Sequence, residues 1–131
     1  MSYEKVKASY DRCCKSGDFF GTFYDSFLNK SPEVAAKFAS TNFKKQKPLI
    51  KASVNMMIRL GTGDIKAREA IEKVGTTHSK PQLNIEPKLY DLWFESLCES
   101  AAKHDSKWNK ELESLWKERM QEGIKIITGR Y

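Results

Sequence analysis

The stretch SPEVAAKF at residues 31–38 has the pattern of a short, capped helix. Ser31 is a favoured N-cap residue, Pro32 suits the first helical position, and an acidic residue follows in the first turn. The polar turn STN at residues 40–42 then leads to a long amphipathic pattern that begins near Phe43. The stretch therefore predicts a short helix that ends in a phenylalanine and is followed closely by a long helix.

The rest of the chain also has helical periodicity. Apolar residues recur at spacings of three and four, whereas Asn-Gly and Asp-Gly turns and long period-two alternation do not occur. We expect an all-α fold of about six to seven helices, with Asp18 and Asp64 as N-caps. Pro48 is expected in the first turn of the long helix, where its missing N–H costs little. The expected helices span residues 2–15, 19–29, 31–38, 43–60, 64–78, 87–104 and 108–127.

Length and composition fit one domain over residues 1–131 with a substantial core. No apolar run approaches the roughly 18 residues of a membrane span, and the polar N-terminus does not resemble a secretion signal. We therefore expect a soluble, cytoplasmic protein that does not bind membranes. The net charge of +6 is modest, and zinc-finger and RNA-binding motifs do not occur, so we expect no nucleic-acid partner.

The three cysteines, Cys13, Cys14 and Cys98, cannot form a disulfide framework. The adjacent pair Cys13-Cys14 allows two interpretations, a redox role or packing on a helix face. We favour packing, because no fixed cation is placed to lower a thiol pKa.

His78 is one of only two histidines, and it lies where a helical pattern ends just before a proline-containing loop. The other, His104, lies near a helix C-terminus beside an acidic residue, which explains it as structural. Taken with the all-helical pattern, the joint spacing of Phe38, Gln46 and His78 resembles a globin of the short, single-domain bacterial kind. The resemblance covers nearly the whole chain. It also implies no D helix, because there is no room for one between Phe38 and Phe43.

The globin resemblance implies one non-covalent haem b per chain. It gives His78 as the proximal iron ligand, Phe38 as the residue that stacks on haem, and Gln46 as the distal polar residue. The absence of Cys-x-x-Cys-His argues against covalent attachment. Further expected pocket residues are Tyr24, at the distal tyrosine position that the resemblance implies, and Ile50, Phe27, Val74, Leu83, Ile85 and Trp93.

Some of these assignments have alternatives. Tyr24 is either a distal donor or a core aromatic, and Trp93 either touches haem or packs between helices. The second ring nitrogen of His78 needs an acceptor, for which the carbonyl of Val74, four residues earlier on the same face, is our first expectation. The hydroxyls of Thr77 and Ser79 are the alternatives.

We expect reversible binding of O2, and of NO or CO, at a pentacoordinate iron, with Tyr24 and Gln46 as hydrogen-bond donors. Binding is favoured over catalysis, but other functions stay open. One is oxidation of NO, which would require a separate reductase because the sequence has no Gly-x-Gly-x-x-Gly motif. Another is gas sensing through a partner, and a last is a haem-free helical interaction module. The chain would act as a monomer or a homodimer.

Overall fold

The computed structural model describes residues 2–131, and these form seven α-helices and no strand. The helices are α1 (Ser2–Lys15), α2 (Phe19–Leu28), α3 (Pro32–Lys37), α4 (Phe43–Arg59), α5 (Ile65–Thr77), α6 (Leu89–His104) and α7 (Lys110–Gly129). A 3-10 helix, Leu60–Thr62, follows α4 directly and ends at Gly63, whose φ of 82° favours glycine. The expected all-α class is confirmed, and residues 38–42 form only a turn between α3 and α4.

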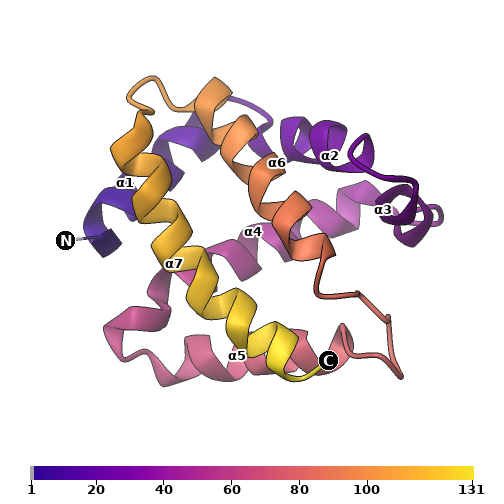
Figure 1. The fold of residues 1–131 in the computed structure, drawn as a ribbon. Coiled ribbons are helices and arrows are strands. Elements are labelled where there is room, and N and C mark those ends of the chain that lie inside the picture. Colours follow the sequence, from indigo (N-terminus) through magenta and orange to yellow (C-terminus); the bar gives the residue numbers. More distant parts are fainter. Residues whose placement is uncertain (1) are drawn as a thin grey trace.

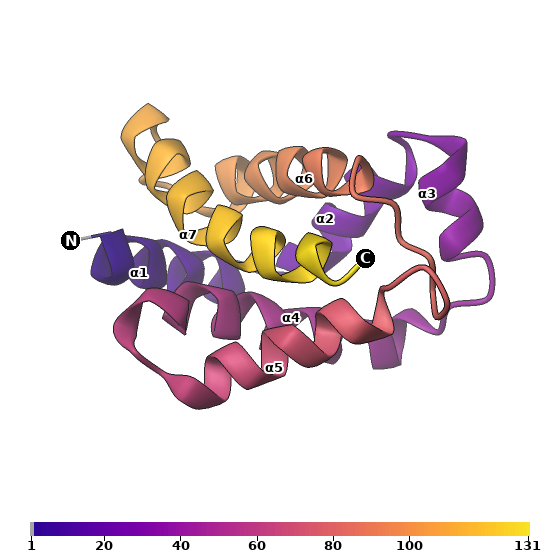
Figure 2. The same ribbon diagram turned by 60° about the horizontal axis from the view of Figure 1, so that its bottom comes forward.

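The helices cross one another in layers (Figures 1 and 2). Helix α7 runs across the molecule and packs against α1, α4 and α5, while α2 packs along α6. A loop at residues 78–88 leads from α5 back to α6 on the side where α3 lies. An ion pair of 3.0 Å between Lys88 and Glu33 connects the end of this loop to α3.

Local capping explains where several helices begin. The expected N-caps are confirmed: Asp18 accepts from the N–H of Gly21, Ser31 from Glu33, and Asp64 from Ala67. Each bond satisfies a backbone donor that has no partner within its own helix. The last two helices begin later than the sequence patterns indicated. Helix α7 begins at Lys110 because Asn109 caps it, which leaves Trp108 in the preceding turn.

The position of Pro48 corrects a sequence prediction. It lies in the second turn of α4, not in the first. The start of α4 is set by Asn42, whose side chain accepts the N–H of Lys44 at 3.1 Å. Proline cannot donate to the Lys44 carbonyl, but both residues are exposed, so water can satisfy that carbonyl.

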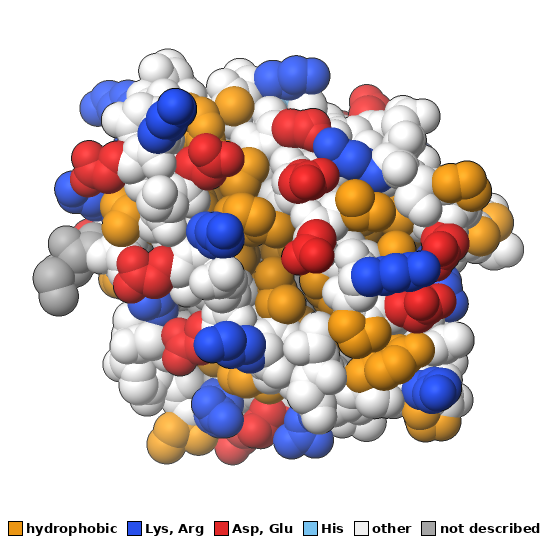
Figure 3. Space-filling view, in the orientation of Figure 1, with side chains coloured by type: hydrophobic (Ala, Val, Ile, Leu, Met, Phe, Trp, Pro, Cys, Tyr) orange, Lys and Arg blue, Asp and Glu red, His pale blue; other side chains and the backbone are white. Residues whose placement is uncertain are grey.

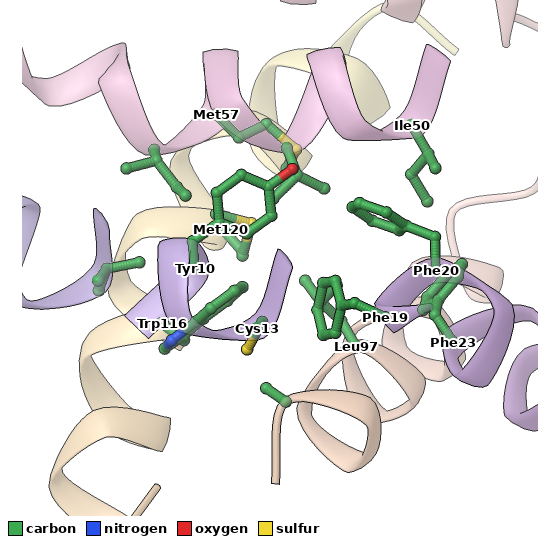
Figure 4. Close-up of a cluster of buried hydrophobic side chains, with 14 of the residues drawn as sticks. Tyr10, Cys13, Phe19, Phe20, Phe23, Ile50, Met57, Leu97, Trp116 and Met120 are labelled. Atoms are coloured by element: carbon green, nitrogen blue, oxygen red, sulfur yellow. The ribbon is translucent and has the colours of Figure 1, made fainter. Parts of the chain in front are cut away.

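The core gathers aromatic and aliphatic side chains from α1, α2, α4, α6 and α7 (Figure 4). Trp116 is fully buried, and its indole N–H donates to Ser9 at 3.0 Å. Cys13 is also fully buried, and burial raises its pKa to about 12, which supports the packing interpretation of this cysteine. Within residues 2–131, none of the helices has the length and apolar character needed to cross a membrane.

A buried polar network connects α1 to the end of α6. The carboxylate of Asp105 accepts hydrogen bonds from Arg12 at 2.6 Å and from Ser9 at 2.5 Å. Burial alone would raise the pKa of Asp105, but hydrogen bonds from these two side chains and from the Lys107 N–H lower it overall. The network is fully satisfied, and its members come from positions about ninety residues apart in the chain.

Candidate functional site

Tyr24 lies inside a group of phenylalanine rings, which we call the aromatic cage. The cage consists of Phe23 and Phe27 on α2, Phe38 after α3, and Phe43 at the start of α4. The Tyr24 ring centroid lies 5.0 Å from that of Phe43 and 5.5 Å from that of Phe38, both edge-on. Only 4% of Tyr24 is exposed. Positions three and four apart along α2 share one face, which is why this helix contributes several rings.

Gln46 reaches the Tyr24 hydroxyl from α4. Burial raises the pKa of Tyr24 to about 12, and a side-chain hydrogen bond with Gln46 offsets part of that increase. The phenol therefore keeps its proton at neutral pH. Ile50, one helical turn after Gln46, is 7% exposed and belongs to the core. The structure thus places the two expected polar donors in contact, next to an apolar wall.

His78 caps the C-terminus of α5. Its backbone N–H donates to the Val74 carbonyl at 2.9 Å. Its ring atom Nδ1 lies 2.8 Å from the Tyr90 hydroxyl on α6, and the two rings are inclined by only 26°. This geometry corrects the expected ring acceptor, because Nδ1 lies beside Tyr90 and no hydrogen bond among residues 2–131 joins the imidazole to the Val74 carbonyl. The Thr77 and Ser79 hydroxyls donate to the Lys73 and Thr76 carbonyls, and neither is bonded to the imidazole.

The other ring nitrogen of His78 is available for a ligand. Burial lowers the pKa of His78, which favours the neutral imidazole. Nε2 has no hydrogen-bond partner among residues 2–131, and it is not fully buried. A neutral imidazole nitrogen with a free lone pair is a common metal ligand. In the described part of the chain, no group of three or more His, Cys, Asp or Glu side chains could hold a bare metal ion.

The remaining expected pocket residues differ in how they are placed. Val74, Ile85 and Trp93 are partly buried and pack against the core. Ile85 stays close to His78, since its N–H donates to the His78 carbonyl at 3.0 Å. The Trp93 ring lies 6.1 Å from that of Phe23, so it packs between α6 and α2. Leu83 is 53% exposed, and the structure does not bring its side chain together with the others.

Sequence reasoning missed two residues of this region, Tyr90 and Phe43. Phe43 was interpreted only as the start of a helix, although its ring stacks on that of Phe38 at 6.1 Å. In the sequence Tyr90 is one of several apolar-side residues of the helix expected at 87–104, and only its contact with His78 distinguishes it. Its position near the start of a helix after the loop that follows His78 was the available indication.

His104, the second histidine, has a structural setting. Nδ1 lies 2.6 Å from the Ser16 hydroxyl and Nε2 lies 2.8 Å from the Thr22 hydroxyl. Both ring nitrogens are therefore engaged, in contrast to His78, and the ring also lies edge-on to Phe19.

One surface hollow lies away from His78 and Tyr24, between α6 and α7. It has a volume of about 360 Å³ and is lined by Phe94, Cys98 and Trp108 together with glutamate side chains. Figure 3 shows hydrophobic side chains along this face, flanked by charged ones. None of the site residues described above lines it.

Comparison with known proteins places this arrangement in a family. The chain is similar to a protein of Pseudomonas aeruginosa PAO1 whose crystal structure is described as structurally highly homologous to a human hemoglobin. The two share 37% sequence identity, with a TM-score of 0.94 over 100% of this chain and 98% of that one. No protein-family model and no curated protein matches the sequence. The chain belongs to the globin family.

Proposed function

We propose that this globin binds one haem b non-covalently through Nε2 of His78 and that it binds O2 reversibly. The observation that carries the proposal is a neutral imidazole with an unengaged Nε2. The Tyr24–Gln46 pair inside the aromatic cage adds two hydrogen-bond donors. The likeness to a structure described as haemoglobin-like supports the same conclusion.

The donor set fits haem better than a bare metal ion. His78 is a single ligand, and no cluster of three metal-binding side chains exists among residues 2–131. A metal held here would therefore need most of its ligands from elsewhere, as a porphyrin provides. Phe38, Val74 and Ile85 are apolar and only partly buried, which suits contact with a flat apolar group.

Haem, when bound, would supply the reversible binding of O2, and also of CO and NO. The chain would provide hydrogen-bond donors for a ligand that carries partial negative charge. Tyr24 presents an O–H that burial keeps protonated, and Gln46 presents an N–H2. Hydrogen bonds to charged acceptors contribute about 1.5–3 kcal/mol. Phe38 and Phe43 restrict water around the tyrosine, which strengthens such bonds.

Haem titration of the purified protein tests the proposal. Wild type should bind haem at one equivalent and show distinct absorption spectra in the ferric state, the reduced state and the reduced state under O2. His78→Ala should lose the specific spectrum. His104→Ala is the matched control, because it removes the histidine whose ring nitrogens are both engaged, and it should keep the wild-type spectra. Haem binding that is indifferent to His78 would refute the proposed ligand.

A further inference from the structure

Positive charge is concentrated in one part of the chain. Residues 34–63 contain five lysines and one arginine but no Asp or Glu, while the whole chain has a net charge of +6. Lys47 and Arg59 form ion pairs with Asp18 and Asp64. The remaining cations of this segment have no carboxylate partner in the part of the chain that the structure describes: Lys37, Lys44, Lys45 and Lys51.

Two of these lysines lie beside an apolar strip on the solvent side of α4. Leu49 is 63% exposed, and Pro48 and Ala52 are exposed next to it. Positions three and four apart share one face of a helix, so Lys45, Leu49 and Ala52 follow one another along this face. We call the surface formed by Lys44, Lys45, Pro48, Leu49 and Ala52 the α4 outer face. It is basic, and its middle is apolar.

The hollow between α6 and α7 has the complementary character. Its floor includes the half-buried rings of Phe94 and Trp108 and the side chain of Cys98, which is 7% exposed. Three carboxylates and one ammonium group complete the lining: Glu95, Glu99, Glu113 and Lys30, which forms an ion pair with Glu99. The hollow is therefore an apolar surface with an acidic rim in a chain that is basic overall (Figure 3).

We propose that this hollow binds the α4 outer face of a second copy of the chain, so that copies associate head to tail. Docking of a helix into an apolar groove through residues spaced by three and four is a common mode of protein recognition. In this contact Leu49 packs against Phe94 and Trp108, and the lysines of the α4 outer face lie opposite the rim carboxylates. The hollow has a volume of about 360 Å³, which leaves room for one such side chain.

The chain carries both halves of the contact but cannot join them within one molecule. Helix α4 lies in a layer with α5, on the other side of the fold from α6 and the hollow (Figures 1 and 2). Because the two surfaces differ, the contact is heterologous, and each added copy leaves one surface of each kind free at the ends. The association does not depend on haem, so it goes beyond the proposed function.

The charges set the conditions under which the association should be seen. The net charge of +6 makes two copies repel each other. At about 0.15 M salt the Debye length is about 8 Å, which screens this repulsion more than it screens charges in contact. Exposed ion pairs contribute little, so burial of Leu49 should determine most of the affinity. We expect weak association, with a Kd of about 10 µM to 1 mM.

Sedimentation velocity of the full chain over that concentration range tests the proposal. The weight-average mass of wild type should rise with concentration. Leu49→Ser should weaken association about tenfold. Ile65→Ser is the matched control, since Ile65 is 73% exposed but lies on α5, and it should associate like wild type. Equal weakening by both substitutions would overturn the role of the α4 outer face.

A variant of the hollow tests the other half of the contact. Ala102 is exposed and lines the hollow, so Ala102→Lys places a cationic chain where Leu49 is proposed to enter, and association should be lost. Ala36→Lys adds the same charge at an exposed position of α3, outside both surfaces, and should keep the wild-type behaviour. Equal loss in both variants would mean that net charge, and not the hollow, is responsible, and would overturn the proposal.

A mixing experiment distinguishes head-to-tail association from a symmetric dimer. Leu49→Ser keeps an intact hollow, and Ala102→Lys keeps an intact α4 outer face. At a concentration where each variant alone is monomeric, the mixture should form one-to-one pairs with no more than twice the monomer mass. Wild type that stays monomeric up to about 1 mM, or a mixture that forms no pairs, would overturn the proposal. Either result leaves the haem proposal untouched, because that proposal is tested by the haem titration.

Discussion

Replacing Tyr24 with phenylalanine removes the more deeply buried donor of the distal pair and should speed the release of O2. The ring stays in place, because its contacts with Phe38 and Phe43 are apolar and need no hydroxyl. A hydrogen bond to a charged acceptor contributes about 1.5–3 kcal/mol. Gln46 remains after the substitution and is only half-buried, so we take the lower value. At about 1.4 kcal/mol per factor of ten, O2 should dissociate about tenfold faster.

Gln46→Leu removes the second donor and should have a smaller effect. Gln46 is half-buried, so water competes for its hydrogen bond and we take about 1 kcal/mol, which corresponds to roughly a fivefold faster dissociation. Because the two side chains contact each other, the double variant should fall short of the product of the two single effects. Stopped-flow displacement of O2 by excess CO measures all three variants. The control is Tyr10→Phe, which removes the hydroxyl of another buried tyrosine, bonded to the Lys51 carbonyl at 2.9 Å. A Tyr24→Phe rate within about twofold of wild type would refute the reasoning, because it lies below the smallest charged hydrogen bond considered.

Three further predictions concern the rest of the molecule. The pKa of Asp105 is lowered because its hydrogen bonds outweigh the effect of burial. The ionised carboxylate therefore stabilises the fold above the pKa that Asp105 has in the unfolded chain. That contribution is lost as pH falls below about 4. Asp105→Asn should cost about 1.5–3 kcal/mol at neutral pH in urea unfolding and should make stability less sensitive to acid. A Cβ at Gly61 would meet the guanidinium of Arg119, and Arg119 is only 8% exposed. Gly61→Ala should therefore lower the free energy of unfolding by about 1–3 kcal/mol. Gly129→Ala has open space around it and should lower the free energy of unfolding little. Cys13, with a pKa raised by burial to about 12, should resist alkylation in the native protein and react once urea unfolds it, and rapid native labelling would contradict this.

Local features of this fold could be predicted from the sequence because they depend on neighbouring residues. The N-caps Asp18, Ser31 and Asp64 each bond to a backbone N–H within three positions. The same reasoning misplaced Pro48, because Asn42 is a stronger determinant of where α4 starts than the preference of proline for a first turn.

Contacts between segments that are distant in the sequence could not be predicted in the same way. The bond between Tyr90 and His78 depends on how the loop at residues 78–88 folds back, which no periodicity encodes. The exposure of Leu83 has the same origin, since that loop turns its side chain outward. By contrast, Tyr24 and Gln46 were assigned to one site only through the family resemblance, and their roles as donors to a ligand stay a prediction, although the two side chains interact.

The polar side chains named above differ in whether hydrogen bonds within the fold engage all of their polar atoms, and this difference distinguishes structural side chains from candidate ligand-binding ones. Asp105 and His104 have their hydrogen-bonding capacity met by side chains from other helices, so these groups stabilise the meeting points of α1, α2 and α6. His78 Nε2 is left without a partner, and Tyr24 and Gln46 have chiefly each other. Nε2 is not fully buried, so its availability does not destabilise the fold and leaves it accessible to a ligand. A group that binds Nε2 in the folded chain alone would stabilise that chain against unfolding, so added haem should raise the unfolding midpoint of wild type and not that of His78→Ala.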